Sequence, residues 1–188
     1  MKLNEKIFLS YKLFNSLFTG LSIGILFTIY KPLEDPSIYS IGGMILSIGM
    51  LILAKFYDKI LNIRSFFRIS LLVEIVILIT LFIFLLLQIS FTSALLIYCG
   101  YQLTFIFGGY LWRAETLVAQ DKKFLTKIDT NKQVGYLIGL GASYSFYKTL
   151  ELGFEISKPE NQISVLHYLL VCLQILIIIL LLKSFRTS

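Results

Sequence analysis

The chain of 188 residues is 57% hydrophobic and only 15% charged, with a mean hydropathy of +0.82. Soluble domains are about 25% charged, so this composition excludes a water-facing globular fold and intrinsic disorder, and predicts that lipid covers much of the surface. The net charge of +6 is spread between apolar segments, which argues against a nucleic-acid-binding patch. With two cysteines and one histidine, we expect no disulfide scaffold, no metal and no other cofactor.

Six apolar segments each approach the ~20 residues needed to cross a bilayer as a helix. In chain order they lie at residues 13–30, 38–56, 66–87, 94–112, 134–147 and 163–182. The first begins only after Lys12 and lacks a small-residue cleavage site, so we expect a retained span and not a signal peptide. The sequence therefore predicts an all-α bundle of six transmembrane helices, a single domain over residues 1–188, in the cytoplasmic (inner) membrane.

The basic residues predict the orientation of the six spans. Fourteen of the seventeen lysines and arginines fall on the side of the two termini. The three on the other side are Lys31, Lys148 and Lys158. Because cytoplasmic loops carry the excess of Lys and Arg, we expect both termini in the cytoplasm.

Small residues at helical spacing predict which spans pack closely, because helices in lipid associate through Gly, Ala and Ser faces. Such pairs occur in the first, second and fifth spans: Gly20 and Gly24, Gly43 and Ser47, Gly135 and Gly139. The third and sixth spans have none. We therefore expect spans one, two, four and five to pack inward and spans three and six to face lipid.

The loop after the second span resembles a known transporter motif. Ala54 is followed four residues later by Asp58 and Lys59, and Arg64 comes after them. This pattern is similar to the loop between helices two and three of the major facilitator superfamily, with Ala54 where glycine is usual. Arg113 corresponds to an arginine often present in that family's fourth helix, and the glycines near residue 139 are similar in style to its fifth.

The resemblance implies half of a transporter. That family has twelve helices in two six-helix halves, with the solute path between them. The resemblance therefore implies that the chain pairs with a second copy or with another half-transporter, and that the pair moves a small-molecule solute by alternating access. The alternative is that the chain is a fragment of a longer gene product.

Asp58, Lys59 and Arg64 form a candidate cytoplasmic gate. A carboxylate at this end of the second span can engage nearby basic side chains in contacts that break when the helices move. The alternative is a solvated loop whose charges follow only the positive-inside rule.

Polar side chains at helical spacing form candidate path stripes inside three spans. The fourth span carries Tyr98, Gln102 and Arg113; the first carries Asn15 and Thr19; the fifth carries Tyr147. We expect these residues to line a solute path. The alternative is that they hydrogen-bond neighbouring helices, and that Arg113 extends to the cytoplasmic interface instead.

Glu74 lies well inside the third span, where an ionisable group is costly. It is a candidate for proton coupling, or else a neutral carboxyl that hydrogen-bonds a neighbour.

An enzyme is not expected, because paired aspartates for metal-bound phosphate, a Cys-x-x-Cys pair and a phosphate-binding glycine loop are all missing from the sequence. The alternative to transport is a membrane subunit that scaffolds or stabilises a larger complex.

Overall fold

The structure is a computed structural model that describes residues 2–186, apart from the side chain of Arg186, one of the charges counted above. The fold is all-α except for a short pairing of the two ends of the chain. The elements are β1 Lys2–Leu3, α1 Glu5–Ser22, α2 Ile25–Ile29, α3 Pro36–Lys55, α4 Tyr57–Ile60, α5 Ile63–Leu87, α6 Phe91–Ala119, α7 Lys122–Gly153, α8 Pro159–Ser184 and β2 Phe185–Arg186.

Polar side chains cap five of the six long helices. Each cap accepts a hydrogen bond from a backbone N–H of the first turn, which would otherwise have no partner. The caps of α1, α3, α5, α6 and α7 are Asn4, Asp35, Asn62, Ser90 and Asp121. These short polar residues between apolar runs explain why each helix begins where it does.

The Asp35 cap predicts a pH dependence at the start of α3. Its carboxylate accepts the Ser37 backbone N–H at 2.8 Å, and that hydrogen bond lowers the pKa of Asp35 below the usual 3.8. A lowered folded-state pKa means that the cap stabilises the helix above the unfolded pKa and is lost as the pH falls through the folded one. We expect the Ser37 amide to lose protection from hydrogen exchange, relative to an unfolded chain at the same pH, as the pH falls below 3.8. The variant Asp35→Ala should show the same loss of protection at neutral pH. Equal protection in both proteins at neutral pH would contradict the cap.

Four helices within residues 2–186 are long and apolar enough to cross a membrane: α3, α5, α6 and α8. They correspond to the predicted second, third, fourth and sixth spans. The first predicted span is instead two helices, α1 and α2, separated by a turn at Ile23 and Gly24. The fifth predicted span lies inside the much longer α7. Helices α1 and α7 do not meet that criterion, and most of the polar side chains of α7 are exposed.

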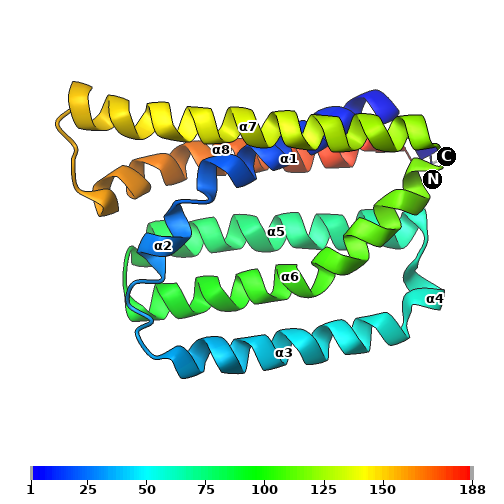
Figure 1. Ribbon diagram of the computed structural model, residues 1–188, viewed down its shortest axis with the longest axis horizontal. Coiled ribbons are helices and arrows are strands. Elements are labelled where there is room, and N and C mark those ends of the chain that lie inside the picture. Colours follow the sequence, from blue (N-terminus) through cyan, green and yellow to red (C-terminus); the bar gives the residue numbers. More distant parts are fainter. Residues whose placement is uncertain (1, 187–188) are drawn as a thin grey trace.

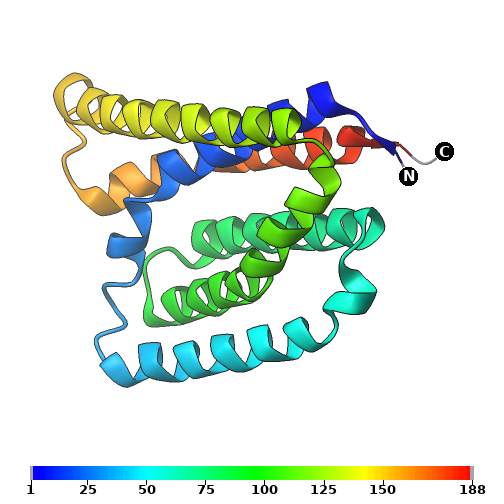
Figure 2. The ribbon, with the colours of Figure 1, turned by 45° about the vertical axis from the view of Figure 1, so that its right-hand side comes forward.

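The axes of the long helices are roughly aligned, in two groups joined through α5 (Figures 1 and 2). Helices α1, α5 and α7 run away from the end that carries the termini, and α3, α6 and α8 run toward it. Helices α1, α7 and α8 form one group, and α6 with α3 forms the other. Both ends of the chain lie at the same end of the bundle, where Lys2 pairs with Arg186 and Leu3 with Phe185 in an antiparallel ladder.

Three glycines allow α1 and α7 to cross with their backbones in contact. A Cβ at Gly20 would overlap the carbonyl oxygen of Tyr136, and one at Gly135 or Gly139 would overlap a carbonyl oxygen of α1. The prediction of close packing through these glycines is confirmed. Gly24 and Gly43, in contrast, face open space.

The second span packs through different glycines from those predicted. In α3, Gly42 lies against the Tyr98 ring and Gly49 against the Ile106 side chain, both on α6. Since Gly42 is one residue before the predicted Gly43, the face that packs is rotated by about 100° around the helix.

The expected division into inner and lipid-facing spans is wrong. Helices α5 and α8 lie at the centre of the bundle and pack against each other, whereas α3 packs mainly on α6 and buries only Gly42. The physical reason is that lipid tails and neighbouring helices are equally apolar. A run of Leu, Ile and Phe therefore does not tell whether a helix faces lipid or another helix.

The helix pairs repeat between the two halves of the chain. Helix α1 packs on α7 and α8, and α6 packs on α3 and α5. The pairs correspond if α1 is exchanged with α6, α3 with α7 and α5 with α8. The α1–α7 pair then becomes the α6–α3 pair, the α1–α8 pair becomes the α6–α5 pair, and the α5–α8 pair becomes itself. Helix α1 runs away from the termini and α6 runs toward them, so the two three-helix units have opposite directions (Figure 1).

Candidate functional site

Glu74 is buried near the centre of the bundle. It lies one residue from the middle of α5 and only 2% of its surface is exposed. Its carboxylate accepts hydrogen bonds from Tyr11 Oη at 2.7 Å, Asn15 Nδ2 at 2.8 Å and Gln174 Nε2 at 2.8 Å. Helices α1, α5 and α8 therefore meet at one carboxyl group, which explains how this polar residue is accommodated in an apolar helix.

Gln174 of α8 has a second role at this point. Its Nε2 also donates to the Glu74 backbone carbonyl at 2.9 Å, while its Oε1 is buried and has no partner within the described residues. A fully buried amide oxygen without a partner is uncommon, and it leaves an acceptor beside the Glu74 carboxyl.

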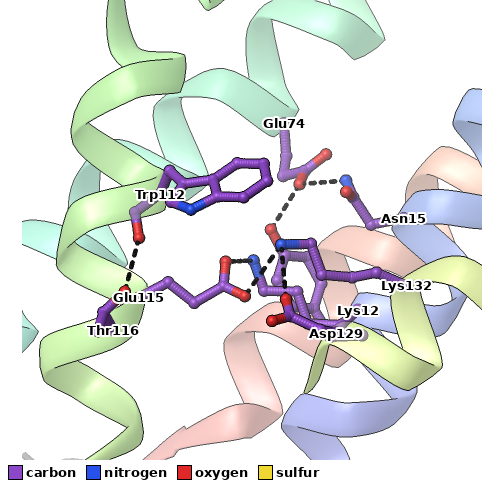
Figure 3. Close-up of polar contacts among 9 residues, drawn as sticks. Lys12, Asn15, Glu74, Trp112, Glu115, Thr116, Asp129 and Lys132 are labelled. Atoms are coloured by element: carbon purple, nitrogen blue, oxygen red, sulfur yellow. Dashed lines mark hydrogen bonds and ion pairs between the residues drawn. The ribbon is translucent and has the colours of Figure 1, made fainter. Parts of the chain in front are cut away.

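A second carboxylate, Glu115 of α6, binds two lysines. Lys12 Nζ of α1 lies 2.7 Å from Glu115 Oε2, and Lys132 Nζ of α7 lies 3.3 Å from Oε1. The Lys12 and Glu115 side chains are 10% and 6% exposed, so this ion pair lies inside the protein. Figure 3 shows Glu74, Asn15, Glu115 and both lysines converging from different helices.

A polar hollow of about 460 Å³ lies beside this cluster, between α1, α6 and α7. It is lined by Ser16, Thr19, Trp112, Asp129, Lys132, Gln133 and Tyr136. The Lys132 ammonium lies 4.8 Å from the centre of the Trp112 ring and 3.7 Å from Asp129 Oδ1. Lys132 thus belongs both to the buried cluster and to the hollow, and it connects the two. Asp129, with a side chain 58% exposed, is the more open of its two carboxylate partners.

A separate groove of about 400 Å³ lies between α3 and α6 and is almost wholly apolar. Tyr98 and Gln102 line it. Tyr98 Oη donates to the Tyr39 carbonyl at 3.4 Å, and Gln102 Oε1 is buried without a partner in the described chain. These two α6 residues therefore face α3 and not the polar hollow.

The six residues predicted to line a solute path do not share one cavity. Thr19 lines the polar hollow, Asn15 binds Glu74, and Tyr98 and Gln102 line the α3–α6 groove. The Arg113 guanidinium is exposed, 5.7 Å from the Tyr57 ring centre. Tyr147 lies toward the far end of α7, packed edge-on against Phe146.

The residues predicted to form the gate are not paired with one another in the described part of the chain. Asp58, Lys59 and Arg64 are exposed, and none of the ion pairs found in residues 2–186 includes them. Lys59 Nζ lies 5.9 Å from the Phe56 ring centre. They lie at the end of the bundle that carries the termini, on α4 and the start of α5.

Sequence reasoning missed Lys12, Lys132 and Gln174. The two lysines were counted only as topology signals, because each lies just outside a predicted span. The capping residues Asn4 and Asp121 are a usable signal, because residues of this type mark helix starts and would have placed both lysines inside helices. No sequence signal pairs Lys12 with Glu115, which is 103 residues away.

The four long apolar helices within the described residues define the class of this chain as a helical membrane protein. Its particular family is not assigned by similarity: no protein-family model, curated protein or solved structure matches the chain.

Proposed function

We propose that this chain is a half-length secondary transporter of a small solute, similar to one half of a major facilitator transporter. Six spans cross the inner membrane, with α1–α2 and α7 as the first and fifth, and both termini lie in the cytoplasm. Two copies pair, and the solute passes between them by alternating access.

The observation that carries the proposal is the repeated helix pairing. The pairs that join α1, α3 and α5 to α6, α7 and α8 map onto one another when the two sets are exchanged, and corresponding helices run in opposite directions. Nested three-helix inverted repeats are the internal symmetry of each half of a major facilitator transporter. The symmetry supports the proposal independently of the Asp58 loop motif, since it rests on packing and not on residue identity.

The polar hollow supports pairing with a second copy. It opens on the side of α1, α6 and α7, and Trp112 beside it is 70% exposed. Polar groups facing lipid are unfavourable, so a second protein surface is needed to cover the hollow. A twofold axis along the membrane normal brings two identical hollows face to face and keeps both pairs of termini in the cytoplasm.

Asp58, Lys59 and Arg64 are proposed to pair across the gate in the other conformation, and Glu74 to couple the cycle to protons. An ionisable residue near the middle of a membrane helix typically marks an ion or proton pathway.

The test begins with the oligomeric state. We expect native mass spectrometry in a mild detergent to give a dimer. In a background with Cys99 and Cys172 replaced by alanine, Gln133→Cys beside the hollow should form a disulfide between copies. Tyr168→Cys on α8, which is 66% exposed, is the matched control and should not.

Transport is tested in liposomes that contain the purified dimer and an enclosed pH dye. Panels of carboxylates, amino acids, sugars and amines are added outside, and we expect at least one class to drive a proton flux that empty liposomes lack. A monomer, or a dimer that moves no member of the panel, would contradict the proposal and favour the scaffold subunit.

A further inference from the structure

The buried charges of the cluster balance only if Glu74 is ionised. Lys12 and Lys132 both bind Glu115, and among the described residues Glu74 is the only other carboxyl buried here. Lys132 has one further carboxylate partner, Asp129 at 3.7 Å, but the Asp129 side chain is 58% exposed, so water screens its charge. An ionised Glu74 therefore makes the buried groups neutral, whereas a protonated Glu74 leaves them with a net charge of about +1.

The surroundings of Glu74 fit both protonation states. The ionised carboxylate accepts from Tyr11, Asn15 and Gln174, as described above. When Glu74 takes a proton from water on Oε2, rotation of the Gln174 amide by 180° turns its Oε1 to accept that proton. The rotated Nε2 then gives up its hydrogen bonds to the Glu74 carboxylate and backbone carbonyl. Burial favours the neutral form, while the three donors and the nearby Lys12 favour the charged one.

The ionisable groups that face Glu74 are few. Helix α1 contributes Tyr11 and Lys12, α6 contributes Glu115, and α7 contributes Lys132 through Glu115. Helix α8 contributes only the neutral amide of Gln174. No other ionisable side chain of the described residues hydrogen-bonds or pairs with this cluster apart from Asp129. Glu115 stays ionised beside Lys12 at 2.7 Å, and Asp129 is largely solvated, so Glu74 is the buried group whose charge can respond to a change at Lys132.

Lys132 is the cation available to a ligand. Its ammonium has three N–H donors, and its nearest acceptor is Glu115 at 3.3 Å. Its side chain is 24% exposed toward a hollow that also offers the Trp112 and Tyr136 rings and the Ser16 and Thr19 hydroxyls. A carboxylate attached to a small apolar or aromatic body fits these groups and the volume of about 460 Å³.

We propose that the hollow binds a small organic carboxylate on Lys132, and that Glu74 takes up one proton when the carboxylate binds. The anion supplies the negative charge that Glu74 gives up, so the cluster stays neutral in both states. Binding of the carboxylate and uptake of the proton concern a single chain, and the inference rests on the proposed function only where it says that the carboxylate is transported. The empty and the loaded form of the protein differ by one anion and one proton.

The binding test uses Trp112, the single tryptophan of the chain. Its fluorescence in detergent is measured against benzoate, benzamide and benzylamine, which share one shape and differ in charge, at a pH where benzoate is ionised. We expect a saturable change with benzoate alone. Lys132→Gln should weaken benzoate binding at least tenfold, and Lys127→Gln, an exposed lysine on the same helix, should leave it within twofold. Equal binding of benzamide, or unchanged binding in Lys132→Gln, would overturn the anion site.

The proton test follows the pH of weakly buffered protein on addition of benzoate. We expect uptake that is absent in Glu74→Gln, a variant that keeps benzoate binding because its neutral amide imitates the protonated carboxyl. By linkage, benzoate affinity should rise as the pH falls in the wild type and stay flat in Glu74→Gln. Binding without uptake, or uptake that persists in Glu74→Gln, would overturn the coupling.

These measurements separate the two proposals. Benzoate binding with proton uptake in a protein that moves no solute would overturn transport alone. Solute flux through a protein that binds no benzoate would overturn the carboxylate site alone.

Discussion

Alanine at Gly139 is expected to destabilise the protein by about 3 kcal/mol, the upper end of what overpacking usually costs. Its Cβ would overlap the Leu17 carbonyl oxygen and lie 3.0 Å from both the Gly20 Cα and the Leu21 backbone nitrogen. These are backbone atoms, so they give way only if α1 and α7 move apart. That separation would also pull Lys132 on α7 away from Glu115.

The matched control is Gly141→Ala, two residues along the same helix, where a Cβ has no neighbour within 4 Å. Because alanine favours a helix over glycine by about 1 kcal/mol, this control should be neutral or slightly stabilising. Thermal unfolding followed by circular dichroism in detergent compares the two variants. Equal midpoints would show that the α1–α7 crossing is not as close as the structure has it.

Lys12→Met is expected to cost about 3 to 5 kcal/mol, the usual effect of removing one partner from a buried ion pair. Lys12 lies 2.7 Å from Glu115, and both side chains are almost wholly buried. The variant leaves Glu115 with Lys132 alone, at 3.3 Å. Glu115→Leu should be similarly harmful, since the Lys12 ammonium would then be left among the Phe8, Tyr11 and Phe66 rings.

The double variant Lys12→Met, Glu115→Leu should be more stable than either single variant, because it leaves no unpaired charge of this pair. Lys132, at 24% exposure, keeps Asp129 as a partner. Lys148→Met is the control, since it removes an exposed pair with Glu151 at 2.6 Å and should change little. Additive losses in the double variant would mean that Lys12 and Glu115 do not interact.

The membrane class and several helix limits could be read directly from the amino-acid sequence. Segments 38–56 and 66–87 lie close to α3 and α5, because hydropathy and polar caps act locally along the chain. The glycines at 20, 135 and 139 were also found in advance, since small residues at helical spacing have few other uses in an apolar helix.

The limits of α1 and α7 were not predicted, because charged residues stopped the apolar windows too early. Lys12 and Lys132 are polar by any scale, but both lie inside helices that bury one face against the bundle. A hydropathy window averages over all faces of a helix, so it misses a helix that is apolar on one face alone.

The sequence by itself determined that the chain needs lipid and where the four long apolar helices lie. Each of these follows from the transfer free energies of neighbouring residues summed along a segment. Only the tertiary structure decided that α3 is peripheral, that Glu74 binds Tyr11, Asn15 and Gln174, and that Lys12 meets Glu115. These contacts join residues 59 to 103 positions apart. Which helices meet is fixed by the fit of their faces, and no sum along one segment contains that information.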